Sequence, residues 1–403
     1  METPVSEIEL EKGRAIPSLI SPAWMPRKLS SASSASLDLM RAVAACAVMF
    51  GHLRTLCFVD YEHVEGKSRA LAALYFLTGF GHQAVMVFFV LSGFLISSTI
   101  LRSHILGGWS WREYAINRAA RLYVVLLPGL LLGWFWDRLG SGLPTAGGLY
   151  SRAIRDLGPA VPLENLTPAA FFGNLFFLQT IRCPTFGSNG PLWSLANEFW
   201  YYVLFPIAAG AALAWAGRRP AAALCLTGLA VGVSAFIGWG MFIGFLIWLA
   251  GFALVLLCSK IQFPSRSRAF VSLFFAALLL AVTLYASRTL WENTLLNDLA
   301  VGFAFAVFLF ATLQSSVGEN SRRYTAMAHE FAGFSYSLYV LHFPFLLFLR
   351  ARFVPTERWQ PTPAHLLQAA PLGAICLLFA WLVSLFTERR TGDARRFLKR
   401  LFA

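Results

Sequence analysis

Long apolar stretches recur along the chain, and ten of them are long enough to cross a membrane. A helix needs about 20 apolar residues to span the hydrocarbon core of a bilayer. The pattern predicts such helices at residues 36–58, 82–101, 120–138, 193–215, 219–237, 240–258, 269–287, 298–316, 329–350 and 366–387. The charge-free run 220–259 counts as two spans because a Gly-Trp-Gly sequence at 238–240 forms a hinge near its middle. The expected fold is therefore all-α, a polytopic bundle of about ten transmembrane helices.

The remaining segments are too polar or too short to cross a membrane. Residues 1–35 are polar and Ser-rich and lack the apolar core of a signal peptide, so we expect a disordered cytosolic arm. Residues 169–180 form an apolar stretch too short to span comfortably, which favours a re-entrant or interfacial helix. No internal repeat or soluble domain interrupts the pattern. The sequence therefore predicts one membrane domain over residues 36–388, followed by a basic cytosolic tail over residues 389–403.

Composition and the placement of charge agree with a membrane protein. The chain is 57% hydrophobic and 13% charged, whereas a soluble domain carries about 25% charged residues. The net charge of +13 comes from basic residues scattered singly between apolar runs, which argues against nucleic-acid binding. With the N-terminus in the cytosol, 21 of the 33 lysines and arginines fall in cytosolic segments. We therefore expect a multi-pass protein of a bacterial inner membrane with both termini cytosolic.

Several common reaction motifs are missing from the chain. The six cysteines form no CxxC pair and most lie inside apolar runs, so neither a metal site nor a disulfide framework is expected. The sequence contains no GxSxG elbow, HExxH motif or P-loop. Nothing in the pattern indicates an oligomeric state. The candidate chemistry must therefore come from polar residues at membrane depth.

The first predicted helix contains the most unusual polar pair. Arg41 and His52 are eleven residues apart, which is close to three full turns, so both share one face about 16 Å apart along the axis. Asp38 lies three residues before Arg41 and can pair with it. Taken alone, Arg41 could equally be an interfacial arginine that extends its charge toward the membrane surface, and His52 could equally be a core histidine with satisfied hydrogen bonds. The shared face favours a functional role, because charge at membrane depth is costly.

Two other helices are expected to bring titratable groups to the depth of His52. Glu198 follows the start of the span at 193–215, and His342 lies in the outer half of the span at 329–350. A histidine with a carboxylate partner is the usual arrangement for activating a hydroxyl group. The alternative is an aromatic belt that contains incidental polar groups.

A basic pair marks the inner end of the third predicted helix. Arg118 and Arg121 are three residues apart and therefore neighbours on one helical face. The planar guanidinium fork suits phosphate recognition. A positive-inside anchor explains a lone pair of this kind at least as well.

Five short motifs resemble those of the acyltransferase 3 family and occur in that family's order over residues 37–344. They are Leu37-Asp38-x-x-Arg41 with His52, residues 88–96 (FFVLSGFLI), Arg118-x-x-Arg121, Trp193-Ser194-Leu195 with Glu198, and Ser335-Tyr336-x-x-Tyr339-x-x-His342-x-Pro344. One departure is Asn197, where many members carry a second acidic residue. Five motifs in the same order make a chance resemblance very unlikely, although each one alone is weak.

The resemblance implies an integral-membrane enzyme that O-acylates cell-surface carbohydrates such as O-antigen, exopolysaccharide or Nod factors, usually with acetyl-CoA as the donor. It implies that Arg41, Arg118 and Arg121 bind the coenzyme A phosphates. Catalysis is then expected from His52, as the base or as a transient acyl carrier, and from Glu198, as the acid that orients it. Ser92, Tyr336 and His342 would bind the sugar or the developing oxyanion, although a structural role is favoured for each of them taken singly. The expected partners are acyl-CoA, a carbohydrate acceptor and the bilayer, with no nucleic acid and no metal.

Three other functions fit the same spans. A flippase or transporter of a lipid-linked sugar would use ten helices with buried charges, but the inverted repeats typical of transporters are not evident. A non-catalytic partner in a polysaccharide export complex is a second alternative. Succinyl transfer is a third, for which an extra basic residue near the thioester would be expected.

Overall fold

The computed structural model describes residues 24–152, 161–263, 265–291, 294–315, 322–354 and 357–402. In these ranges the chain folds into helices joined by short connections, and the two β-contacts, Phe58 with Trp359 and Gln179 with Cys183, are isolated bridges. The predicted all-α helix bundle is confirmed. Residues 1–23 of the predicted arm lie outside the described ranges.

Thirteen α-helices and four 3-10 helices are seen in the described part of the chain. The α-helices are α1 (Ser31–Cys57), α2 (Arg69–Leu77), α3 (Gly81–Ile105), α4 (Trp111–Ser141), α5 (Pro168–Leu175), α6 (Leu192–Ala216), α7 (Pro220–Lys260), α8 (Arg266–Thr289), α9 (Thr294–Gln314), α10 (Arg322–Ala332), α11 (Ser335–Phe353), α12 (Pro363–Phe386) and α13 (Thr391–Leu401). The 3-10 helices are η2 (Tyr61–His63), η3 (Pro144–Ala146), η4 (Leu149–Ser151) and η6 (Glu388–Arg390).

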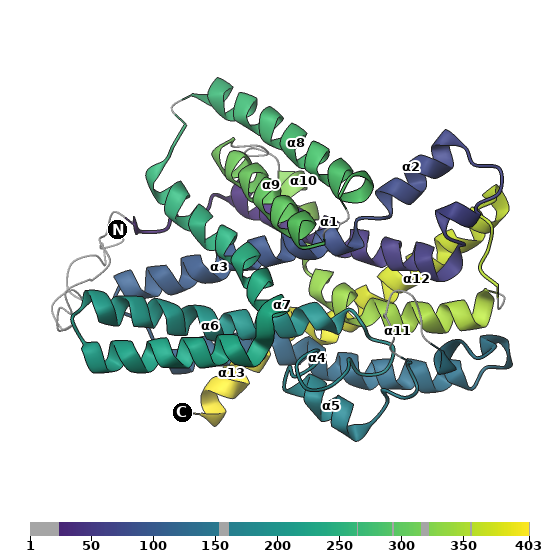
Figure 1. The fold of residues 1–403 in the computed structure, drawn as a ribbon, viewed down its shortest axis with the longest axis horizontal. Helices are drawn as coiled ribbons and strands as arrows, with labels where there is room; N and C mark the ends of the chain where they lie inside the picture. Colours follow the sequence, from purple (N-terminus) through teal and green to yellow (C-terminus); the bar gives the residue numbers. More distant parts are fainter. Residues whose placement is uncertain are drawn as a thin grey trace, which may run out of the picture.

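Each predicted span corresponds to a helix or to part of one. Eight of the described helices are long and apolar enough to cross a membrane, and α10 with α11, bent by 43°, add a ninth if counted as one span. These eight include α7 as a single helix. Its 41 residues, if straight, would be about twice as long as a bilayer core is thick, so α7 is long enough for two spans. Gly238 breaks it with a φ of 77°, and the chain turns back there (Figure 1), as the predicted hinge requires.

The first helix begins five residues earlier than predicted. Ser30 is its N-cap, and the Ser30 hydroxyl oxygen accepts a hydrogen bond from the Ser33 amide at 3.1 Å. A serine cap satisfies an amide that the first turn would otherwise leave unpaired. Residues 31–35, assigned to the arm from the sequence, therefore belong to α1.

The described chain starts and ends at the same end of the bundle. Trp24 packs against Lys260 at the end of α7, with the ammonium nitrogen 3.5 Å from the ring centroid. At the other terminus, Lys399 of α13 pairs with Glu113 at the start of α4 at 2.8 Å. Both contacts lie toward the left of Figure 1, whereas α2 and the connection between α11 and α12 lie at the right. We call the first the inner end and the second the outer end.

The closest helix contact joins α3 to the second arm of α7 through two glycines. A Cβ atom on Gly93 would lie 1.9 Å from the Trp248 carbonyl oxygen, and one on Gly251 would lie 2.2 Å from the Val90 carbonyl oxygen. The two backbones therefore touch, which is how small residues pack helices within a membrane. This contact places Ser92 and Trp248 side by side, 3.2 Å apart between Oγ and Nε1.

Substituting Gly93→Ala should lower the yield and thermal stability of the folded protein. The added methyl group must push α3 and α7 apart, and overpacking of this kind costs about 1–3 kcal/mol or more. Gly228→Ala in α7 is the matched control, because a Cβ there meets nothing within 4 Å. Size-exclusion chromatography of heated detergent extracts measures both variants. Equal melting temperatures would contradict the close-contact interpretation.

Candidate active site

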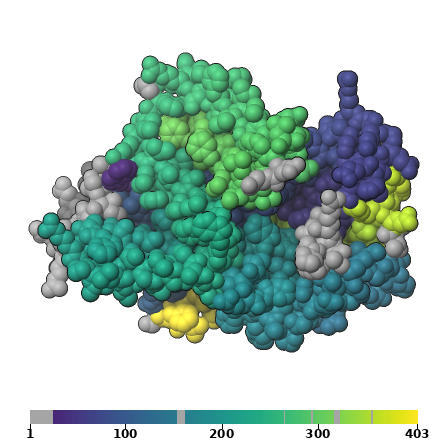
Figure 2. All heavy atoms as spheres, in the orientation of Figure 1, coloured from purple at the N-terminus to yellow at the C-terminus, as the bar shows by residue number. Residues whose placement is uncertain are grey.

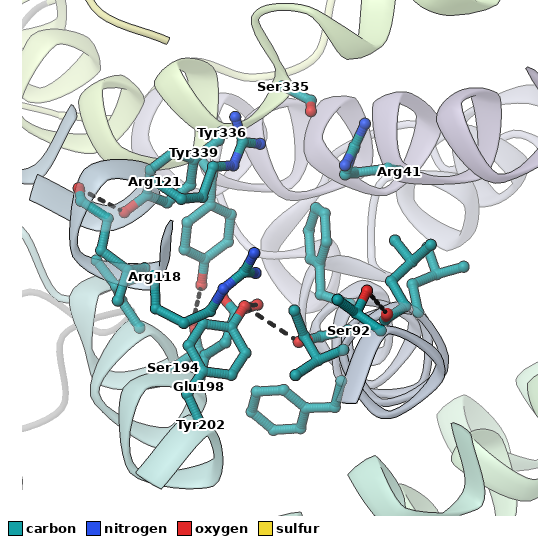
Figure 3. A pocket seen from close by; sticks show the side chains of 18 of the residues that line it. Arg41, Ser92, Arg118, Arg121, Ser194, Glu198, Tyr202, Ser335, Tyr336 and Tyr339 are labelled. Atoms are coloured by element: carbon teal, nitrogen blue, oxygen red, sulfur yellow. Dashed lines mark hydrogen bonds between the residues drawn. The ribbon is translucent and has the colours of Figure 1, made fainter. Parts of the chain in front are cut away.

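An inner cavity of about 330 Å³ lies among six helices and carries most of the predicted polar residues (Figure 3). Its basic lining comes from α1, α4 and α13: Arg41, Arg118, Arg121 and Arg395. Its other polar lining comes from α3, α6 and α11: Ser92, Ser194, Glu198, Tyr202, Ser335, Tyr336 and Tyr339. The cavity therefore combines four guanidinium groups with a single carboxylate.

The arginines of this cavity are not equally available to a ligand. Arg41 pairs with Asp38 at 2.6 Å, as predicted from their spacing. Arg118 lies over the Tyr202 ring, 5.6 Å from its centroid, and forms no ion pair with any described residue. Of the predicted phosphate-binding residues, Arg118 is thus the one whose charge is left for a ligand.

Arg121 is instead held by a buried carboxylate that the sequence reasoning missed. Glu388, between α12 and α13, accepts from the Arg121 guanidinium at 2.9 Å. It also accepts from the Ser337 amide at 2.9 Å and hydroxyl at 3.0 Å. Glu388 is 6% exposed. The one signal in the sequence was an acidic residue directly after an apolar span, at the start of a basic tail.

Glu198 is the end of a chain of hydrogen bonds that crosses the cavity wall. The Trp248 indole donates to the Ser92 hydroxyl, and Ser92 donates to the Tyr202 hydroxyl, each at 3.2 Å. Tyr202 in turn donates to the Glu198 carboxylate. The Ser92 hydroxyl is therefore already engaged, and so is that of Tyr336, which donates to the Leu122 carbonyl at 3.2 Å.

His52 lies in a second cavity of about 290 Å³, nearer the outer end. Its Nδ1 is 2.8 Å from Nε2 of His342, with the two rings stacked at 5.0 Å. Nδ1 of His342 lies 3.0 Å from the Leu338 carbonyl oxygen and 2.9 Å from that of Tyr339. Carbonyl oxygens only accept, so Nδ1 of His342 carries a proton.

The pair of histidines therefore has a defined direction. In a neutral His342 ring with a proton on Nδ1, Nε2 must accept, so it accepts from the Nδ1–H of His52. Nε2 of neutral His52 then carries the lone pair, and it has no hydrogen-bond partner among the residues that the structure describes. His342 is 1% exposed and lines neither cavity. Its geometry is that of a group that orients His52.

The structure does not place Glu198 beside His52, contrary to the expected pairing. Glu198 lines the inner cavity and His52 the outer one. The reason is that the chain before α6 enters the bundle: Ser188 is fully buried, and the side-chain amide of Asn189 donates to the Val340 carbonyl at 2.9 Å. α6 thus begins near the level of His342, and Glu198 lies about two turns further in.

One side chain belongs to both cavities. Tyr339 lines each of them, and its hydroxyl is held by Ser194 at 2.6 Å and by the Pro191 carbonyl at 3.0 Å. The inner cavity with its arginines and the outer cavity with His52 therefore share a wall.

The five motifs and the helical fold agree with a comparison of the chain with known families. Residues 34–385 match a family model described as an acyltransferase domain. The chain belongs to the acyltransferase 3 family. The motif resemblance is thereby confirmed, and the chain is a multi-pass membrane protein of this family.

Two curated relatives match this chain over part of their length. Nodulation protein 10 of Rhizobium leguminosarum bv. viciae is 25% identical over 182 residues, which are 44% of this chain and 45% of that protein. An O-acetyl transferase of Shigella phage Sf6 is 25% identical over 177 residues, 42% of this chain and 44% of that protein. The matched region thus spans less than half the length of each relative. No solved structure matches the chain.

Glu388→Gln should destabilise the protein by about 3 kcal/mol, because removing one partner of a buried ion pair leaves the other uncompensated. Glu113→Gln is the matched control, since its pair with Lys399 is exposed and contributes little. Denaturation with increasing SDS, followed by circular dichroism, measures both. A loss in Glu388→Gln no larger than in Glu113→Gln would show that the Arg121 pair does not hold the helix ends together.

Proposed function

We propose that this acyltransferase moves an acetyl group from acetyl-CoA to a hydroxyl group of a cell-surface or lipid-linked carbohydrate in the bacterial inner membrane. The observation that carries the proposal is the pair of cavities. One holds an arginine without an ion-pair partner among the described residues, the other holds a histidine with an available nitrogen, and Tyr339 alone is common to both linings. A donor in the inner cavity and an acceptor in the outer cavity would lie on the two sides of this shared side chain.

The inner cavity is the proposed donor site. Coenzyme A carries phosphates, and guanidinium groups bind phosphate oxygens through two parallel hydrogen bonds. Arg118 supplies the available charge, with Arg41 beside it and Arg395 of α13 at the same cavity. The inner end also carries the basic clusters of both termini, which supports a cytosolic location for them and for the donor.

The outer cavity is the proposed site of the chemistry. Nε2 of His52 takes the proton from the acceptor hydroxyl as that oxygen attacks the thioester carbonyl carbon. The tetrahedral intermediate expels the coenzyme A thiolate, which takes the proton back from His52. His342 acts as a positioning residue, because its hydrogen bond keeps the lone pair of His52 on Nε2. A two-step route would use the same nitrogen as the acyl carrier, and trapping of labelled acetyl on His52 without acceptor distinguishes the two routes.

The comparisons support the acyl unit and disfavour the transport alternative. One relative is a phage O-acetyl transferase, which supports acetyl over succinyl transfer. A flippase needs no histidine with an available nitrogen in its outer cavity, and the matching family model describes an acyltransferase domain.

His52→Ala should lower transfer by about 100- to 10,000-fold without loss of folded protein, because the general base is removed. The assay supplies acetyl-CoA to sealed inverted membrane vesicles and follows acetylated glycan by mass spectrometry. His365→Ala is the control: His365 stacks on Trp359 at the outer end and lines neither cavity. Near-normal transfer by folded His52→Ala protein would exclude His52 as the base, and equal transfer in right-side-out vesicles would reverse the topology.

Arg118→Ala should raise the KM for acetyl-CoA about tenfold or more with a smaller change in kcat, because phosphate contacts form before the reaction and persist through it. Lysine should rescue poorly, since a point charge cannot reproduce the planar fork. Arg112→Ala is the matched control on the same helix, because Arg112 lies outside the cavity and bonds to the Phe402 carbonyl. Initial rates measured against acetyl-CoA concentration give KM and kcat for each variant. A defect in kcat alone would contradict the phosphate-binding role and indicate that Arg118 only anchors α4.

A further inference from the structure

The outer cavity has a charge pattern that the proposed reaction does not by itself require. Arg54 near the end of α1 and Arg288 near the end of α8 both line it, together with His52. No aspartate or glutamate appears in its described lining. Cavities lined by one sign of charge attract ligands of the opposite sign. Transfer to a neutral sugar would need only the histidine.

The lack of a side chain at Gly79 leaves room for Arg288 in this cavity. Its guanidinium lies so close to Gly79 that a Cβ atom there would be 2.6 Å from Nη2. Arg288 is exposed and forms no ion pair within the described ranges, so its charge is available at the cavity. α2 and α8 lie side by side there, with Phe76 6.0 Å from Tyr285 between ring centroids (Figure 2). A snorkelling arginine would extend toward the lipid headgroups instead.

His82, which also lines this cavity, has partners of its own. It pairs with Asp298 at 2.7 Å, and its ring stacks against Trp193 at 6.0 Å. Arg54 is held over the Tyr75 ring, 5.0 Å from its centroid. Two cations therefore flank the space in front of His52, with one flat aromatic wall.

We propose that the acceptor carries an anionic group, a sugar carboxylate or a phosphate, which Arg288 and Arg54 bind while its hydroxyl lies against Nε2 of His52. This inference rests on the proposed function and names its substrate class. The cavity, about 290 Å³, is at the lower end of ligand pockets. It suits a single acidic sugar unit of the acceptor. Binding of the anionic group holds the sugar unit in one orientation, and this orientation determines which hydroxyl group lies next to Nε2 of His52.

The test compares three soluble acceptors with the purified full-length enzyme and acetyl-CoA: methyl glucoside, methyl glucuronide and methyl glucoside phosphate. We expect kcat/KM to be about ten- to a hundredfold higher for an anionic acceptor, the range for hydrogen bonds to a charged group. The glucuronide and phosphate arms distinguish the two sources of the anion. Arg288→Gln should abolish the preference, so that charged and neutral acceptors are used at similar rates, and Arg288→Lys should restore part of it.

Two further variants complete the design. Gly79→Ala leaves Arg288 in the chain but displaces its guanidinium, and should reduce the preference in the same way. Arg266→Gln, at the inner end of α8 and outside the cavity, should keep the wild-type preference. Transfer by the wild-type enzyme without any anionic preference, or a preference unchanged in Arg288→Gln, would overturn this inference alone. No transfer to any of the three acceptors would overturn it together with the proposed function.

Discussion

Charged side chains at membrane depth must be compensated inside the protein, and this constraint organises the inner half of the molecule. Helices α1, α4 and α11 and the 3-10 helix η6 lie around the arginines of α1 and α4. A guanidinium group that binds a carboxylate or packs on an aromatic ring of another segment holds the two segments together. Glu388 does this most completely, since it holds Arg121 and the start of α11 at once. Arg118 of α4, which has no carboxylate partner among the described residues, is the arginine left for a ligand.

The two proposed half-sites are separate in this fold. Donor phosphates need permanent positive charge, whereas a general base needs an unprotonated nitrogen, so the two roles fall to different residue types. In this fold Arg118 and His52 line different cavities that share the Tyr339 wall. The hydrogen bond from His52 to His342 fixes the tautomer and the orientation of the base without a carboxylate among the described residues that line its cavity.

Much of the fold followed from local pattern. The spans, the hinge at Gly238 and the shared face of Arg41 and His52 all depend on residues close together in sequence, where helix geometry is constant. The start of α1 and the depth of Glu198 were not predicted correctly. The start of α1 depends on a serine cap that lies before the apolar run. The depth of Glu198 depends on a loop that enters the bundle. Hydrophobic periodicity predicts neither feature.

The sequence by itself determined that this chain is a bundle of apolar helices with a few costly polar residues, and which residues those are. Only the tertiary structure decided how they are paired. His52 meets His342 and Arg121 meets Glu388 across 290 and 267 residues of chain. Such pairs depend on which helix faces touch, and backbone contacts such as Gly93 with Trp248 fix those faces. Helical periodicity orients a side chain on its own helix, but packing between helices selects its partner.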